Sequence, residues 1–220
     1  MTEPAKTTAA ILPPRQLAES RDRWRRLLKC KLHLHLAFAF CARTAWPEAQ
    51  HQLGCLENAA STLSAETFNT LEYQILYLSG VINQGTGNIS AALSYYRKPS
   101  LSLPSSSQPA LPPIHLEFCI LSALNILLIV HHPSHPSYHL LQPLLENLTP
   151  LCKKNSNNKA LYAAYQLVSA TCFPPTSILP VKQHLQFAVD AAKGCSNEQL
   201  LCMTLHVIWF KFFKGVRVIF

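Results

Sequence analysis

Apolar residues recur every three or four positions along most of the chain, a spacing typical of helices that bury one face. Residues 180–193 show this pattern most clearly. The apolar residues on their shared face are Val181, Leu185, Ala188 and Ala192. Alternation of apolar and polar residues, which would indicate strands, is rare, and Asn-Gly hairpin turns are absent. The sequence therefore predicts an all-α fold.

Proline, glycine and polar clusters divide the apolar pattern into about nine helices. Ser20 is a suitable N-cap for the first helix, Pro47 suits the first turn of the second, and Gly194 is a natural stop for the eighth. The expected helices cover residues 20–43, 47–60, 65–84, 89–97, 114–130, 137–152, 159–172, 180–193 and 197–214. Short turns between them predict antiparallel pairs, as in an α-solenoid.

Three segments depart from the helical pattern. Residues 1–19, which contain Pro4, Pro13 and Pro14, are expected to form a disordered leader. Residues 98–113 are rich in proline and serine and are expected to form a loop. Residues 217–220 form an atypical tail. The predicted helical-repeat domain is therefore residues 20–216.

One pair of helices matches the tetratricopeptide repeat. That repeat places a small residue, a second small residue, an aromatic residue and a proline at fixed intervals. Gly80, Ala92, Tyr96 and Pro104 fall at those intervals. Tyr96 is expected to pack against Gly80 in the core rather than to form a binding platform with Tyr95. Later helices match the pattern poorly, so the repeat is tetratricopeptide-like and degenerate.

The composition favours binding to other molecules. Apolar residues make up 49% of the chain and charged residues 14%, which suggests that a partner or missing chain covers part of the apolar surface. The formal net charge is +8. Much of it comes from Arg21, Arg23, Arg25, Arg26, Lys29 and Lys31. This run is compatible with a plain solvated helix face, DNA phosphates, an acidic protein or lipid headgroups.

The eight cysteines form no C-x-x-C pair, and most lie within apolar helical runs. Reduced, buried thiols of this kind indicate a cytosolic or nuclear protein. No secretory signal is predicted in residues 1–20. The most apolar run, from Leu116 to Val130, is too short for a membrane span and contains Glu117 and Asn125, so a core helix is expected.

Candidate sites for metal and phosphate are weak. His131, His132, His135 and His139 lie close in sequence, but the intervening prolines and the lack of nearby thiolate or carboxylate ligands favour a solvated loop over a zinc site. Gly85-Thr86-Gly87 lacks the Gly-Lys-Ser/Thr sequence and the preceding strand of a phosphate-binding loop. We expect a turn between helices there, with no metal and no cofactor.

Catalytic patterns are also lacking. Cysteine and histidine residues are present, but no recognisable spacing joins a nucleophile to a base. Acidic residues number only eleven, so paired carboxylates are scarce. The protein is therefore expected not to be an enzyme.

Several segments resemble, in order, fungal members of the cohesin loading factor family, the tetratricopeptide-type subunit of the cohesin loader. They are Leu76 to Asn88 with Ala91 to Leu93, Ala123 to Ile129 with Pro133 to Pro136 and Leu148 to Cys152, and matching stretches between Ala164 and Val216. The resemblance covers about residues 45–216. Family members normally continue with further helices, whereas this chain ends with Arg217 to Phe220, so a fragment is expected.

The resemblance implies a nuclear, non-enzymatic scaffold. Such proteins bind the large HEAT-repeat subunit of the loader, hold its extended N-terminal segment in a concave groove, and support cohesin loading on chromatin and sister-chromatid cohesion. Cohesin and chromatin are then indirect partners, direct DNA contact stays open, and no membrane is expected. Tyr73 and Asn83, on a first helix of a pair, are candidate groove residues. The alternatives are a tetratricopeptide-like adaptor with another client and a peripheral membrane protein that uses its basic N-terminal and apolar C-terminal helices.

Overall fold

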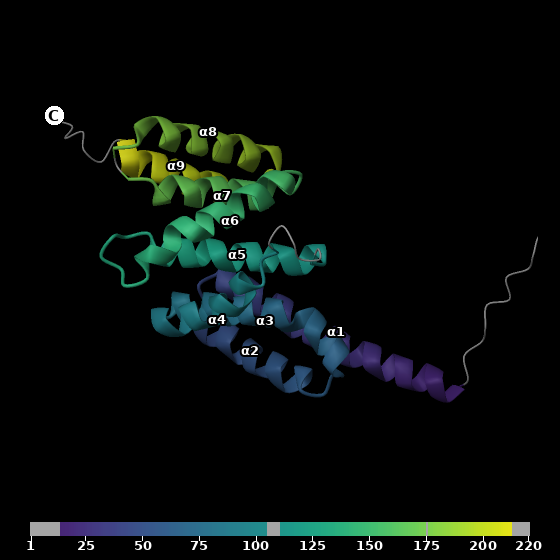
Figure 1. Ribbon diagram of the computed structural model, residues 1–220. Coiled ribbons are helices and arrows are strands. Elements are labelled where there is room, and N and C mark those ends of the chain that lie inside the picture. The colour runs from purple at the N-terminus through teal and green to yellow at the C-terminus, as the bar shows by residue number, and fades with distance from the viewer. Residues whose placement is uncertain (1–13, 105–110, 175, 213–220) are drawn as a thin grey trace, which may run out of the picture. The chain divides into compact units, whose positions relative to one another are not determined.

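A computed structural model describes residues 14–104, 111–174 and 176–212 (Figure 1). Within these ranges the regular structure is entirely helical and no strand occurs, which confirms the predicted all-α repeat fold. The helices are α1 (Pro14–Ala42), α2 (Trp46–Ala60), α3 (Ala65–Gly85), α4 (Ile89–Leu101), α5 (Pro113–Val130), α6 (Leu141–Lys154), α7 (Lys159–Cys172), α8 (Ile178–Gly194) and α9 (Glu198–Phe212).

The chain forms two compact units, and the boundary between Ile75 and Leu76 falls within α3. In the first unit α1 packs on α2. The His33 and Gln52 side chains are joined by a 2.8 Å hydrogen bond, and Arg26 donates to the carbonyl of Thr62 at 3.3 Å. Arg26 precedes His33 on α1, whereas its partner Thr62 follows Gln52 along the chain, so the two helices run antiparallel.

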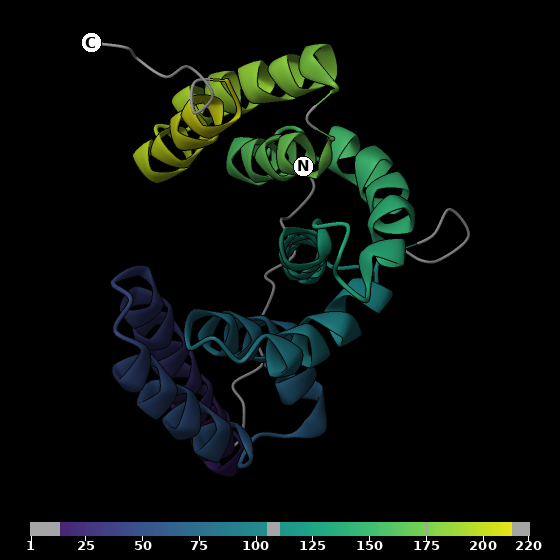
Figure 2. The same ribbon diagram turned by 90° about the vertical axis from the view of Figure 1, so that its left-hand side faces the viewer.

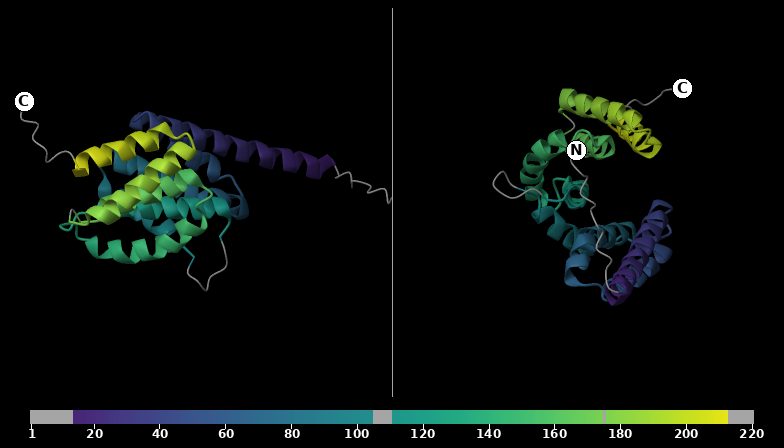
Figure 3. Two further views of the ribbon diagram at one scale, coloured as in Figure 1. Left: turned by 90° about the horizontal axis from the view of Figure 1, so that it is seen from above. Right: turned by 90° about the vertical axis from the view of Figure 1, so that its right-hand side faces the viewer.

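The first helix is longer than predicted. It begins at Pro14 instead of near Ser20, so residues 14–19 are helical and do not belong to a leader. Proline is well tolerated in the first turn, where no amide hydrogen is needed, which makes Pro14 a suitable start. The N-terminal half of α1 extends past the end of α2 (Figure 3). Residues 1–13 and 217–220, predicted as leader and tail, lie outside the described residues.

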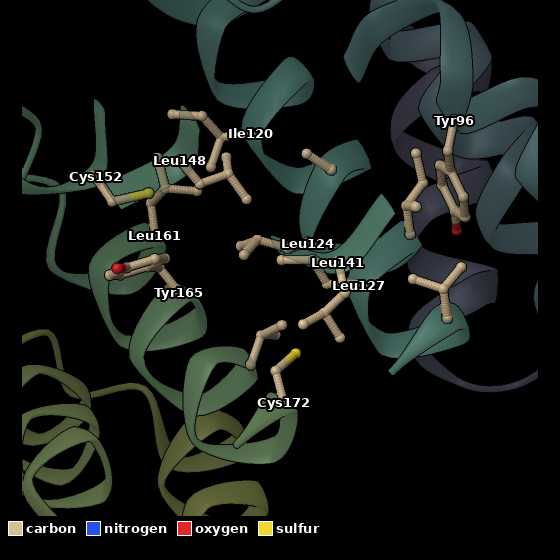
Figure 4. Close-up of a cluster of buried hydrophobic side chains, with 14 of the residues drawn as sticks. Tyr96, Ile120, Leu124, Leu127, Leu141, Leu148, Cys152, Leu161, Tyr165 and Cys172 are labelled. Carbon is tan, nitrogen blue, oxygen red and sulfur yellow. The ribbon is translucent and has the colours of Figure 1, made fainter. Parts of the chain in front are cut away.

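In the second unit, helices α5, α6 and α7 follow one another, and α8 and α9 both pack on α7 (Figures 1 and 2). α5 lies at the centre, because its buried side chains meet those of α6 and α7 (Figure 4). Residues of this cluster include Ile120, Leu124 and Leu127 from α5, Leu148 and Cys152 from α6, and Leu161, Tyr165 and Cys172 from α7. A second cluster joins α7 to α8 through Leu167, Ala170, Val181, Leu185 and Ala188.

By length and composition alone, α5 is the one helix in the described part of the chain that could cross a membrane. In this fold it is a core helix, because eight of its residues are buried. They are Cys119, Ile120, Ser122, Ala123, Leu124, Ile126, Leu127 and Val130.

The segment between α4 and α5 is shorter than the predicted loop. α4 continues to Leu101 and contains Pro99 in its last turn, and α5 begins at Pro113. Pro99 and Ser100 are buried, so packing outweighs the hydrogen bond that proline cannot make. Residues 105–110 of this segment lie outside the described residues. A short 3₁₀ turn, Tyr138–Leu140, precedes α6, which therefore begins later than expected.

Candidate protein-binding grooves

The Gly80–Tyr96 pair joins α3 to α4. Both Tyr96 and Ala92 are fully buried. A methyl group on Gly80 would lie 2.6 Å from Tyr96 Cδ1 and 2.7 Å from Cζ, so the ring occupies the space next to the glycine. The Tyr96 hydroxyl donates to Gln84 Oε1 at 2.9 Å. Pro104, the fourth residue of the repeat pattern, lies half-buried just beyond the end of α4. Tyr96 is thus a core residue.

Tyr73 and Asn83, the predicted groove residues, are both half-buried on α3. The Asn83 side chain donates to the carbonyl of Ser79 at 2.8 Å, one turn earlier in the same helix. Neither residue lines the two grooves described next.

A groove of about 700 Å³, here called the α6–α8 groove, lies between α6 and α8 and has α7 as its floor. Its α6 wall includes Thr149 and Lys153, and Phe187 on the α8 wall is 53% exposed. Two hydrogen bonds tie the floor to the walls. The hydroxyls of Thr149 and Tyr165 are 2.9 Å apart, and Gln166 Oε1 pairs with His184 Nδ1. Floor and walls are therefore held in register by side-chain contacts.

His184 belongs to this network. Its ring lies 5.2 Å, centroid to centroid, from that of Phe173. Burial lowers the pKa of His184, and the nearby positive charge of Lys153 lowers it further. The imidazole is therefore neutral at pH 7, and its Nδ1 pairs with the buried amide of Gln166.

Ser169 is the unsatisfied group on the groove floor. It is 2% exposed, and its Oγ has no hydrogen-bond partner within the described structure. It shares one helical face of α7 with Tyr162, Tyr165 and Gln166, which also line the groove. A buried hydroxyl without a partner carries a free-energy cost, so Ser169 calls for an explanation.

A second groove, here called the α5–α9 groove, measures about 710 Å³ and contains residues that follow α5, residues at the end of α7, and α9. Phe210 on its α9 wall is 52% exposed. Lys211 Nζ donates to the carbonyls of Thr171 at 3.3 Å and Phe173 at 3.2 Å. Burial lowers the pKa of Lys211. The ammonium group thus satisfies carbonyls at the end of α7 and holds α9 against it.

Three histidines of the predicted cluster make local contacts. His131 Nδ1 lies 2.7 Å from the carbonyl of Leu128, His132 Nδ1 lies 2.6 Å from Ser134 Oγ, and His135 Nδ1 accepts from the Ser137 amide at 3.1 Å. Across the described residues, no three metal-ligating side chains lie close enough to share an ion.

The buried cysteines are poor nucleophiles. Burial raises the pKa of Cys119 and of Cys152 to about 12, and that of Cys172 to about 11. These thiols are protonated at neutral pH, whereas the thiolate is the reactive form. The geometry of these residues favours a packing role.

The basic run of α1 is accompanied by an apolar stripe whose exposure the sequence did not predict. Trp24, Leu28 and Leu32 recur every fourth residue and are 62%, 58% and 56% exposed. All six arginine and lysine residues between positions 21 and 31 are exposed as well, and Arg25 lies 3.7 Å from Asp22. The spacing of the stripe is visible in the sequence. The opposite face of α1 carries Cys30, Leu34 and Ala37, which are buried. Packing against α2 therefore decided which of the two apolar faces is exposed to solvent.

The groove residues Gln166, Ser169, His184 and Phe187 were also missed. Their sequence signal is weak, because polar residues on an otherwise apolar helix look alike whether they face a groove or a neighbouring helix. Only the position of α6 and α8 around α7 distinguishes the two cases.

Comparison with curated proteins and with solved structures gives no match. The family model described as cohesin loading factor matches residues 7–218. This range includes the whole of every described helix, from α1 to α9. A match over nearly the full length, on a chain folded as paired helices, shows that the protein belongs to the cohesin loading factor family.

Proposed function

We propose that this protein is a non-catalytic scaffold subunit of the cohesin loading complex, and that it binds the large HEAT-repeat subunit of the loader. The observation that carries the proposal is the family match over residues 7–218. Membership of the family gives a role in cohesin loading. The specific partner, the nuclear location and the support of sister-chromatid cohesion are parts of the proposal.

The fold suits a scaffold. Stacked helix pairs expose long surfaces that can hold an extended peptide along several repeats. The described cysteines at the core are protonated and packed, so they supply no activated nucleophile. Binding, in place of catalysis, is the use that this arrangement supports best.

We place one part of the partner segment in the α5–α9 groove. α5, α7 and α9 are the first helices of successive pairs, and first helices form the inner surface in tetratricopeptide-type repeats. Phe210 offers exposed aromatic surface there, and Pro133 and Val207 add apolar wall. Tyr73 and Asn83 lie on α3, another first helix, and are proposed as further contacts.

The test is a binding measurement with the recombinant N-terminal segment of the large loader subunit from the same organism. The full chain should retain the segment. Phe210→Glu should weaken binding about tenfold, because a carboxylate would replace the aromatic ring that the bound segment covers. Phe187→Glu is the matched control, since Phe187 is 53% exposed against 52% for Phe210 but lies in the other groove. A folded wild-type chain that does not bind the segment would contradict the proposal.

The second candidate function is that of a peripheral membrane protein. It is favoured by the exposed Trp24, Leu28 and Leu32 stripe beside six exposed basic residues, the pattern of helices that lie in a membrane surface. Sedimentation with vesicles containing phosphatidylserine distinguishes the two. Binding that is lost in Leu28→Glu would support the membrane role, whereas an unbound chain that retains the loader segment supports the scaffold. A helical chain that binds neither would leave a tetratricopeptide-like adaptor with another client as the function.

A further inference from the structure

The α6–α8 groove has features that packing alone does not require. It is lined by exposed or half-buried aromatic rings at its rim, namely Tyr138, Tyr162 and Phe187. Its floor carries hydrogen-bonding groups, of which the Ser169 hydroxyl has no partner in the described structure. A volume of about 700 Å³ is within the range of ligand-binding clefts.

The hydrogen bonds across the groove show which residues lie toward each of its two ends. Thr149 pairs with Tyr165, and Gln166 pairs with His184. Lys153 lies one turn beyond Thr149 on α6, and Tyr162 lies one turn before Tyr165 and Gln166 on α7, so both lie toward one end. Glu146 and Ser169 lie toward the other end by the same reasoning.

The charge at the rim is balanced. The α6 wall supplies one carboxylate, Glu146, and one ammonium group, Lys153, seven residues apart and therefore about 10 Å apart along the helix. His184 is the only other titratable imidazole, ammonium or carboxylate among the groove residues. The balance favours a ligand with both charges over a phosphate-rich one, since a polyanion would meet Glu146 as well as Lys153.

We propose that the α6–α8 groove is a second peptide-binding site, separate from the surface proposed for the loader segment. Its ligand is an extended protein segment in which an aromatic residue is flanked by a basic residue, which pairs with Glu146, and an acidic residue, which pairs with Lys153. The aromatic side chain packs among Tyr162, Phe187 and the floor. The backbone of the segment supplies the hydrogen-bond partner that Ser169 lacks, after a rotation of the serine side chain between its staggered rotamers.

The distance between Glu146 and Lys153 determines how far apart the two charged residues of a peptide probe should be. An extended peptide covers about 3.3 Å per residue, so the charges are about three to four positions apart. Successive side chains of an extended segment point to opposite sides, so a separation of four places both charges and the central aromatic residue on the same side. The probes are fluorescein-labelled serine–glycine peptides with the central sequence Lys-Ser-Phe-Ser-Glu or Glu-Ser-Phe-Ser-Lys, and a control in which phenylalanine is replaced by serine. Fluorescence anisotropy with the full chain measures binding.

One charge order should bind, and the control without phenylalanine should bind at least about tenfold more weakly. Phe187→Glu should abolish the binding, and Phe210→Glu, with a ring of matched exposure on α9, should preserve it. The double variant Glu146→Lys with Lys153→Glu should prefer the opposite charge order. Circular dichroism confirms that each variant keeps its helices.

Three results would overturn the inference. They are no binding of either charge order, equal binding to Phe187→Glu and the wild-type chain, and an unchanged order preference in the charge-swapped variant. Because the probes contain no loader sequence, these results leave the proposed loader function untouched.

Discussion

The ring of Tyr96 fills the space that a side chain on Gly80 would occupy. A methyl group there would lie 2.6 Å from Tyr96 Cδ1, well inside van der Waals contact. The hydroxyl of the same ring donates to Gln84, one turn beyond Gly80 on α3. Tyr96 therefore fixes the close approach of α3 and α4, with a glycine below the ring and a hydrogen bond at its tip.

Gly80→Ala should destabilise the chain by about 2 kcal/mol, because overpacking of a filled core outweighs the gain in helix propensity. The measurement is urea unfolding followed by circular dichroism. Gly54→Ala is the control, since it is also within a helix but a methyl group there meets nothing within 4 Å. That variant should be about 0.5–1 kcal/mol more stable than wild type. Equal effects of the two substitutions would contradict the packing argument.

Ser169→Ala should leave the fold intact and raise its stability by up to about 1 kcal/mol, because the buried hydroxyl makes no hydrogen bond in the described structure. The same substitution should weaken probe binding in the α6–α8 groove. Thermal unfolding and anisotropy on the same sample test both effects. Thr149→Val is the contrast, since it removes a hydroxyl that pairs with Tyr165 and should destabilise the chain by about 1 kcal/mol. A less stable Ser169→Ala chain would show that the hydroxyl has a partner.

His184 should make stability depend on pH. Burial lowers its pKa in the folded state below the value of about 6.5 expected in the unfolded chain. In the window between the two values the unfolded state binds more protons, so stability rises with pH and is lost as the solution is acidified below about 6.5. The loss between pH 7.5 and pH 5 should be smaller in His184→Asn. Identical pH profiles for variant and wild type, from urea unfolding, would exclude this role.

The thiols should differ in their reaction with an alkylating reagent. Cys202 is exposed and should react in the native state, whereas Cys119 and Cys152 are buried with their pKa raised to about 12 and should react only on unfolding. Peptide mass spectrometry after timed labelling with iodoacetamide, with and without urea, measures this. Rapid native labelling of Cys152 would mean that α6 opens from the core.

Much of the fold was predictable from the sequence because it depends on local patterns. The apolar period of residues 180–193 gave α8 and its buried face, Val181, Leu185, Ala188 and Ala192, which is the face observed. The spacing of Gly80 and Tyr96 gave the α3–α4 contact, because a glycine and a ring at that interval serve one packing geometry. The turn at Gly85-Thr86-Gly87 gave the start of a helix at residue 89, and in the structure the Asn88 side chain caps it by accepting from the Ala91 amide.

Where local preference and packing disagree, only the tertiary structure decided. Pro99 would end a helix by its chemistry, yet α4 continues through it because the turn is buried. α1 has two apolar stripes, and contact with α2 selected the one with Cys30, Leu34 and Ala37 and left Trp24 and Leu28 open. The α6–α8 groove is the strongest case. Ser169 and His184 are fifteen residues apart on different helices, and their common groove exists only once three helices are packed. The sequence determines which residues share a face of a helix, but only the neighbouring helices decide whether that face borders a groove or another helix.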